Sequence, residues 1–139
     1  MADDEIVTLL NKVGQLLAED VEYPLDGTFL HAEVDQGYVS PSIYKDLGDK
    51  VLYRDPDLDR LGDCLMDLWA AYPETKRWAE MLYTVRGKSF EANFLYASDF
   101  DPKEWPMERR SRLVKEHFGD KPVIYPPLQS DGIGEVYTL

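Results

Sequence analysis

Few residues of this sequence belong to the types that perform acid–base or nucleophilic chemistry. His31, His117 and Cys64 are the only histidines and the only cysteine among its 139 residues. His31 falls on the polar side of an expected strand, so we expect it to be solvated. His117 lies in the last turn of an expected helix, where a cation suits the helix dipole. Cys64 is expected to be a small buried or boundary side chain. We therefore predict no catalytic residues; a Cys–His nucleophilic pair is the enzymatic alternative.

The acidic run Asp55-Pro-Asp57-Leu-Asp59 invites comparison with a calcium-binding loop. An EF-hand requires glycine at its sixth position and glutamate at its twelfth, and this sequence has Arg60 and Met66 there. Helix capping explains the same aspartates better. The sequence also lacks a nucleophile elbow, a phosphate loop, a dinucleotide fingerprint and a zinc pattern. We expect neither a metal site nor a cofactor.

Exposure to solvent alone does not explain the spacing of one set of acidic residues. These residues, here called the acidic ridge, are spaced by four: Asp55, Asp59, Asp63 and Asp67. Like charges at this spacing oppose helix formation by roughly 0.2–0.5 kcal/mol per pair, and only Arg60 is near enough in sequence to offset them. A ridge that costs stability is a candidate binding site for a basic partner, such as the nucleic-acid groove of a nuclease. The alternative is that hydration and the helix dipole tolerate it.

A basic cluster of opposite sign follows near the end of the chain, with the members Arg109, Arg110, Arg112 and Lys115. Glu108 and Glu116 each stand four residues from Arg112, so part of this cluster is neutralised along its own helix. We expect Arg109 or Arg110 to dock on a carboxylate of the same domain rather than to bind nucleic acid.

The net charge of −12 is unevenly distributed. Residues 1–75 hold 17 acidic and 5 basic residues, whereas residues 76–139 hold ten of each. A negative field of this kind repels nucleic acid and anionic membranes and attracts basic proteins, although solubility alone also explains an acidic surface. The single cysteine excludes an intramolecular disulfide, the N-terminus is acidic where a signal peptide is basic, and no apolar run reaches membrane-spanning length. We expect a cytoplasmic protein.

The first half of the chain predicts a helix followed by a strand meander. Apolar residues at three- and four-residue steps indicate an amphipathic helix over residues 4–19. Period-two alternation then predicts strands at 28–35, 38–45 and 50–54, with a hairpin turn at Gln36-Gly37. In the first strand, Thr28, Leu30, Ala32 and Val34 share one face, while Phe29, His31, Glu33 and Asp35 share the other. Pro41 indicates that the second strand is an edge or carries a bulge.

The second half of the chain predicts a helix, a hairpin and a further helix. Asp55-Pro56 predicts a helix start that Asp55 caps, and the helix runs to near Pro73. A hairpin at 77–86 and 89–98 precedes a helix at 106–118, an extended segment at 122–127 and a flexible tail at about 128–139. We predict one α+β domain over residues 1–139. Its roughly five-stranded antiparallel sheet packs against an N-terminal helix, a middle helix and a short C-terminal helix.

Residues 89–127 carry a family resemblance. An aromatic alternating strand leads into the acidic turn Ser98-Asp-Phe-Asp-Pro102, then Pro106-Met-Glu-Arg-Arg110, and the helix ends at His117-Phe-Gly-Asp120. This stretch, of which about 35 residues are specific, resembles the YezG-like family of bacterial immunity proteins, and the order of elements also agrees. The sequence departs from the family pattern where Leu113-Val-Lys-Glu-His117 replaces an aromatic-rich continuation, and in its longer proline-rich tail.

The resemblance implies a cytosolic antitoxin of a polymorphic-toxin or contact-dependent competition system. Such proteins bind and neutralise a cognate toxin domain, often a nuclease, and are not enzymes. With the acidic ridge as the candidate contact surface, electrostatic steering would make association fast and salt-sensitive. The alternative is an acidic binding module or secretion-chaperone-like protein, which a dimer with a large apolar interface would favour. An enzyme of another type is the third hypothesis, and it requires a pocket with converging titratable groups.

Overall fold

A computed structural model describes residues 2–125 of the chain. Its elements, in chain order, are α1 (Ala2–Leu17), β1 (Thr28–Asp35), β2 (Tyr38–Asp46), β3 (Val51–Arg54), α2 (Leu58–Ala70), β4 (Glu80–Arg86), β5 (Ser89–Leu95), α3 (Pro106–Phe118) and β6 (Val123–Ile124), with short 3₁₀ turns at Glu74–Lys76 and Ala97–Asp99. None of the described helices is both long and apolar enough to cross a membrane. The tail expected at 128–139 lies outside the described residues.

The six strands form one sheet in the order β5-β4-β1-β2-β3-β6. Neighbouring strands are antiparallel, apart from β3 and β6, which are parallel. The expected α+β class and single domain are confirmed, but the sheet has six strands rather than about five. The additional strand, β6, contributes only Val123 and Ile124, and two residues are too few to show the alternation by which a strand is recognised.

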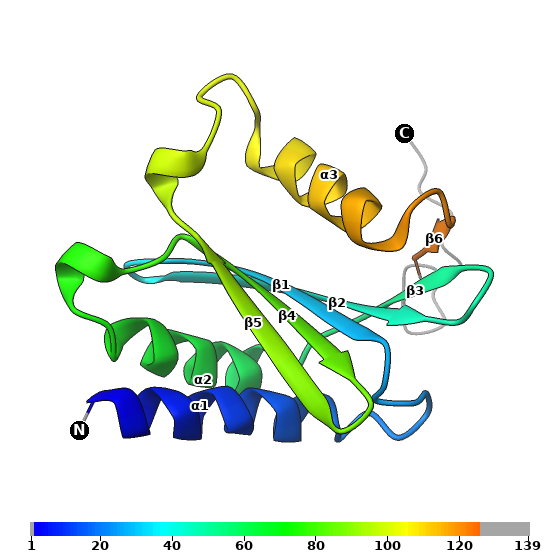
Figure 1. Cartoon of the computed structure of the whole chain (residues 1–139), viewed down its shortest axis with the longest axis horizontal. Coiled ribbons are helices and arrows are strands. Elements are labelled where there is room, and N and C mark those ends of the chain that lie inside the picture. Colours follow the sequence, from blue (N-terminus) through cyan, green and yellow to red (C-terminus); the bar gives the residue numbers. More distant parts are fainter. Residues whose placement is uncertain (1, 126–139) are drawn as a thin grey trace, which may run out of the picture.

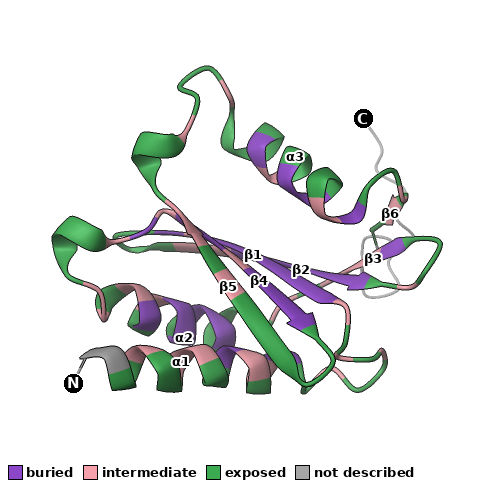
Figure 2. Cartoon of the chain, in the orientation of Figure 1, coloured by how far each residue is buried: buried purple, intermediate pink, exposed green. Residues whose placement is uncertain are grey.

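Helices cover both faces of the sheet (Figure 1). α1 and α2 lie on one face, where the larger core includes Val13, Leu30, Leu65 and Trp78. α3 crosses the opposite face over a smaller core formed by Phe29, Tyr44, Val51, Val114 and Phe118. In Figure 2 the buried residues of each helix follow the side that faces the sheet. The fold therefore has three layers, with the sheet in the middle.

Strand β1 is buried on both faces, which corrects one sequence prediction. Leu30, Ala32 and Val34 face α1 and α2, as expected. The other face was expected to be polar and solvated at His31, yet Phe29 and His31 are 1% and 2% exposed. The reason is α3, which covers that face. The expectation failed because a polar side chain can be buried when it has a hydrogen-bond partner, and His31 has Glu80 at 2.8 Å.

Pro41 lies in β2, which is an internal strand rather than the expected edge. β1 pairs with the whole of β2, so that Pro41 stands opposite Ala32. β3, in contrast, pairs only with the segment from Ile43 to Asp46. At Pro41 the strand thus has a neighbour on one side alone, and the missing N–H of proline interrupts no ladder there. The prediction was wrong for the strand as a whole and right for its first half.

A close contact between α1 and β4 generates a stability prediction. The Tyr83 hydroxyl donates a hydrogen bond to the Leu10 carbonyl at 2.8 Å. A Cβ atom added at Gly14 would lie 2.8 Å from the same hydroxyl. We expect Gly14→Ala to destabilise the protein by displacing this hydroxyl. In a Tyr83→Phe background, the same change should stabilise it by up to about 1 kcal/mol through helix propensity.

Chemical denaturation of the wild type, Gly14→Ala, Tyr83→Phe and the double variant measures the effect on the free energy of unfolding. A Gly14→Ala change of equal size and sign in both backgrounds would contradict the contact.

Candidate functional site

The candidate site is built on α2, whose start differs from the prediction. Asp57, not Asp55, is the N-cap: its backbone is extended and its carboxylate accepts a hydrogen bond from the Arg60 N–H at 3.1 Å. Pro56 therefore lies before the helix rather than at its first position. Asp55 and Asp57 are both suitable capping residues, and the sequence alone did not distinguish them. The helix also ends earlier than expected, at Ala70 instead of near Pro73.

Three of the four ridge residues lie on the outer face of α2. Its buried residues are Leu61, Gly62, Cys64, Leu65 and Leu68. Asp59, Asp63 and Asp67 are on the opposite side and are all exposed. Asp55 is exposed too, but it belongs to the loop between β3 and α2. The structure therefore places three ridge carboxylates in a row at about 6 Å intervals, with Asp55 before the start of the helix.

The ridge carboxylates are uncompensated within the described part of the chain. No hydrogen bond or ion pair to the side chains of Asp55, Asp59, Asp63 or Asp67 is formed among residues 2–125. Arg60, the cation expected to offset them, instead makes a bidentate ion pair with Glu19 at the end of α1, in which Nη2 lies 2.8 Å from Oε2. The ridge thus keeps its full negative charge toward solvent.

A hollow of about 490 Å³ adjoins the start of the ridge, between the end of α1 and the β3–α2 loop. Its walls include four carboxylates: Glu19, Asp20, Asp55 and Asp57. Lys45 lines it from the sheet and is 2% exposed. Its ammonium donates to the Thr28 hydroxyl at 2.8 Å and the Pro24 carbonyl at 3.1 Å. Burial lowers the pKa of Lys45. The ammonium group of Lys45 therefore lies inside the protein, and most of the charged side chains around the hollow are carboxylates.

Arg54 on β3 is paired with Asp20 in the same hollow. Two hydrogen bonds of 2.7 and 3.1 Å join its guanidinium to the carboxylate. Partial burial opposes ionisation of Asp20, but these bonds outweigh it and hold the pKa of the carboxyl below its ordinary value. Arg54 and Arg60 are thus both committed to carboxylates outside the ridge.

A deeply buried charge interaction lies on the other face of the sheet, beneath α3. Glu80 at the start of β4 is completely buried, and Arg109 of α3 is 6% exposed. Arg109 Nε and Nη2 donate to Glu80 Oε2 at 2.7 and 2.6 Å, while His31 Nε2 lies 2.8 Å from Oε1. Arg109 also stacks over the Phe100 ring at 3.6 Å. The prediction that Arg109 or Arg110 docks on a carboxylate of this domain is confirmed for Arg109.

Glu80 was missed by sequence reasoning, although one signal pointed toward it. Arg109 stands four residues before Leu113, so it shares the inward face of α3 and needs a buried counter-charge. What the sequence did not supply was the pairing of β4 with β1, which brings Glu80 opposite Glu33 and close to His31. Complete burial opposes ionisation of Glu80, but the hydrogen bonds from His31 and Arg109 hold its pKa below the ordinary value.

The remaining candidate catalytic side chains are engaged in packing. The His117 ring stacks on Phe29 with centroids 4.2 Å apart. Burial, followed by the charge of Arg86, lowers the pKa of His117; this favours a neutral packing group rather than the expected cation at the helix end. Cys64 is buried as predicted, and its thiol contacts the Leu9 carbonyl at 3.7 Å. The two histidines and the cysteine thus have separate structural partners.

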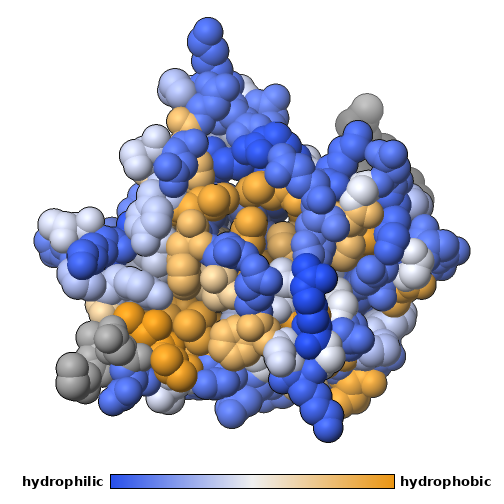
Figure 3. Space-filling model, viewed as in Figure 1, coloured by the Kyte–Doolittle hydropathy of each residue, from blue (hydrophilic) through white to orange (hydrophobic). Residues whose placement is uncertain are grey.

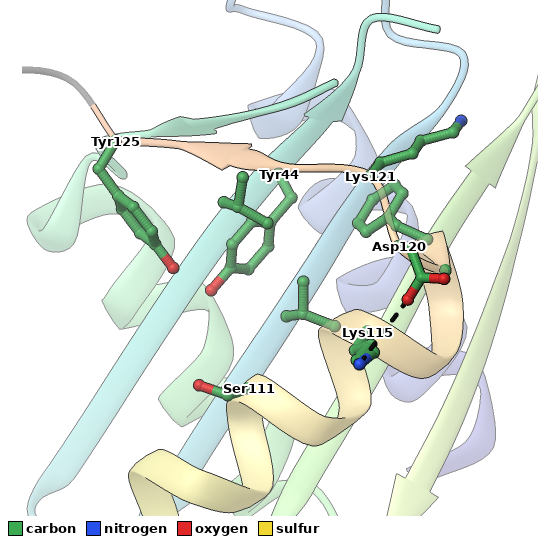
Figure 4. A pocket seen from close by; sticks show the side chains of 10 residues that line it. Tyr44, Ser111, Lys115, Asp120, Lys121 and Tyr125 are labelled. Carbon is green, nitrogen blue, oxygen red and sulfur yellow. Dashed lines mark ion pairs between the residues drawn. The ribbon is translucent and has the colours of Figure 1, made fainter. Parts of the chain in front are cut away.

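A second hollow, of about 310 Å³, lies between the end of α3 and strands β2 and β6. Figure 4 shows the hydroxyl-bearing ends of Tyr44 and Tyr125 directed the same way, with the Ser111 hydroxyl on α3 near them. Lys115 is 3.7 Å from Asp120 in a weak ion pair, and Lys121 pairs with Asp46 at 2.9 Å, outside the group of hydroxyls. The lysines of this hollow are thus paired with carboxylates away from the tyrosine hydroxyls, and the hollow does not form a catalytic constellation.

Residues 2–125 contain no group of three or more histidine, cysteine, aspartate or glutamate side chains arranged to hold a metal ion. A comparison with protein-family models found no match to this chain, and a comparison with curated proteins found none either. The site is therefore defined by its own geometry, as an acidic and uncompensated surface on α2.

The buried Glu80 network predicts a pH-dependent stability. Glu80→Gln should lower the free energy of unfolding by about 3–5 kcal/mol at pH 7, because it leaves buried Arg109 with only the more distant carboxylate of Glu33, 4.0 Å away. Since the folded-state pKa of Glu80 is lowered, its contribution is complete above the ordinary value of 4.5 and is lost as pH falls through the lower folded-state value. Wild type and variant should therefore converge below pH 4.5, as measured by denaturant unfolding at a series of pH values.

The matched control is Glu104→Gln, which removes the partner of Arg112 in a more exposed pair. It should change stability much less. Equal unfolding energies of wild type and Glu80→Gln at pH 7 would show that the network does not support the fold.

Proposed function

We propose that this protein is an immunity protein: a cytoplasmic antitoxin that neutralises a cognate bacterial toxin domain by stoichiometric binding. The acidic ridge on α2 is the surface that contacts the toxin. The toxin domain is basic, and a nuclease is the class that fits best. The protein acts by occupying its partner's surface and performs no chemistry of its own.

The observation that carries this proposal is that residues 2–125 provide no hydrogen bond or ion pair to the ridge carboxylates. Asp59, Asp63 and Asp67 repel one another along the helix, which costs roughly 0.2–0.5 kcal/mol per pair. The nearest cation, Arg60, turns away from them to Glu19. A row of negative charge that weakens its own helix is explained when a positively charged surface neutralises it in a complex. A nuclease provides such a surface, because it must bind the phosphate backbone of its substrate.

Two further observations support binding as the mode of action. The side chains available for catalysis are separately engaged: His31 with Glu80, His117 with Phe29, and Cys64 with the Leu9 carbonyl. In addition, the stretch 89–127 resembles YezG-like immunity proteins. The resembling stretch occupies β5, the turn after it and α3.

A secretion-chaperone-like binding module is the alternative, and one observation favours it. Trp105 and Met107, at the start of α3, are 74% and 70% exposed. Exposed large apolar side chains of this kind suit the capture of apolar client segments. The two functions differ in the partner they require: one basic toxin domain, or a set of exported clients.

The experiment that tests the proposal is affinity capture of the tagged protein from its own organism, with the bound protein identified by mass spectrometry. The proposal expects one partner with a basic toxin domain, whose activity is lost at equimolar addition of this protein. Capture of diverse clients, or of a secreted protein without toxic activity, would support the chaperone alternative and contradict the immunity function.

Charge reversal on the ridge gives a quantitative prediction for that complex. The double variant Asp63→Lys/Asp67→Lys should weaken toxin binding about tenfold or more, chiefly by losing favourable charge pairing. The affinity of the wild-type protein should fall as salt is added, and the affinity of the variant should depend less on salt. Isothermal titration calorimetry at two ionic strengths measures both effects.

The control for this experiment is Asp49→Lys/Asp120→Lys, which makes the same change in net charge at two exposed positions away from α2. It should leave affinity close to that of the wild type. If the two double variants weaken binding equally, net charge and not the ridge governs the interaction.

A further inference from the structure

Strand β5 forms one edge of the sheet, and no other strand of residues 2–125 pairs with its outer side. It pairs with β4 along its whole length, from Ser89 to Leu95, and is the outermost strand on that side. Its single charged side chain is Glu91, and it contains no proline. Edge strands of monomeric proteins usually carry a lysine, a proline or a bulge that prevents pairing with another chain. β5 has none of these devices.

The ladder establishes which backbone groups of β5 face outward. The Val34 N–H donates to the Ala79 carbonyl just before β4, and the Gly27 N–H donates to the Val85 carbonyl near its end, both at 3.0 Å, so the carbonyls of odd-numbered residues point toward β1. The Ala79 N–H is an exception at the strand start, because it donates to the Leu95 carbonyl of β5 at 2.8 Å. Because these groups alternate along an antiparallel strand, the even-numbered residues of β4 bond to β5. The register joins them to Ser89, Glu91, Asn93 and Leu95. The N–H and C=O groups of Phe90, Ala92 and Phe94 therefore point away from β4.

The side chains of β5 divide into an apolar and a polar row. Phe90, Ala92 and Phe94 face the α1 side, where Phe90 is 37% exposed and stacks on Tyr83. Glu91 and Asn93 face the α3 side, and the Asn93 amide donates to the Glu91 carboxylate at 3.0 Å. Figure 3, which views the molecule from the side of β5, shows apolar side chains gathered around this strand within a hydrophilic surround.

We propose that β5 pairs with β5 of a second copy of this chain, antiparallel and about a two-fold axis at Ala92, so that the two sheets become one. In this register every outward backbone group of Phe90, Ala92 and Phe94 is paired. Ala92 lies opposite Ala92 of the second copy, and Phe90 lies opposite Phe94, which forms two aromatic cross-strand pairs. A two-fold interface must be complementary to itself in this way.

The charges of β5 select the same register. An axis at Ala92 places Glu91 opposite Asn93 of the second copy, so each carboxylate meets an amide donor. An axis at Glu91 would instead place two carboxylates directly opposite each other, which is unfavourable. The near-neutral strand thus permits pairing, and its one charge excludes the alignment centred on Glu91.

This dimer is independent of the proposed function. The interface lies at the β5 edge, whereas Asp59, Asp63 and Asp67 face away from the sheet on α2. Both copies therefore keep their ridges free. The contact is made mainly by strand backbone, and it differs from the large apolar dimer interface expected of a secretion chaperone.

Opposite substitutions at Asn93 test the register in the isolated protein. Sedimentation velocity should give twice the 16.0 kDa mass of one chain. Asn93→Glu places like charges opposite Glu91 and should raise the dimer dissociation constant about tenfold or more. Asn93→Lys places opposite charges there and should leave the constant unchanged or lower it. Pairing of residue 93 with Glu91 of the second copy predicts these opposite signs.

Ala92→Pro provides a second variant that keeps the monomer intact, because the Ala92 N–H makes no bond to β4. It should give a folded monomer with a thermal unfolding midpoint close to that of the wild type. A wild-type protein that is monomeric throughout, or a dimer equally insensitive to both Asn93 variants and to Ala92→Pro, would overturn the proposal. So would a monomer in which β5 gains protection from hydrogen exchange only when a different protein binds.

Discussion

The arrangement of this molecule depends on one buried carboxylate. Glu80 is completely enclosed between the sheet and α3, and a charge in that position is tolerated only when it is paired and hydrogen-bonded. Arg109 and His31 meet this requirement from α3 and β1. The network joins two strands and a helix that are far apart in sequence. It thereby orients α3 so that Val114 and Phe118 reach the smaller core.

The same constraint explains which parts of the fold the sequence predicted. Local sequence patterns predicted the two helices that flank β4 and β5, and turn residues predicted the hairpin of β1 and β2. The inward face of α3 predicted that an arginine, Arg109 or Arg110, docks on a carboxylate. The burial of His31 did not follow, because it depends on α3 crossing that face of the sheet more than 70 residues later in the chain. Glu80 was missed for the same reason, since its environment is created by β1 and α3 rather than by its neighbours.

For the candidate site, the sequence predicted the spacing of the ridge aspartates but not their surroundings. The period of four placed Asp59, Asp63 and Asp67 along one flank of a helix, and the structure has them there, exposed. Asp55 lies before the helix because Asp57 provides the cap. The sequence also suggested Arg60 as compensation, whereas the position of α1 gives it Glu19 as its partner. The ion pair between Arg60 and Glu19 is a tertiary contact, and no local sequence pattern indicates it.

The acidic character of the first half of the chain thus has two different outcomes. Glu19 and Asp20 each have an arginine partner and join α1 to α2 or to β3. The ridge carboxylates have no such role among residues 2–125, and their repulsion is uncompensated. We therefore infer that different acidic residues serve stability and binding.

Carboxylate footprinting of the protein, free and bound to its captured partner, tests that claim most directly. Amine labelling in the presence of carbodiimide, read by mass spectrometry, reports how accessible each carboxylate is. We expect Asp59, Asp63 and Asp67 to react readily in the free protein and to be strongly protected in the complex, while Asp49 reacts equally in both. Unchanged labelling of the ridge, with protection at other carboxylates, would contradict the claim.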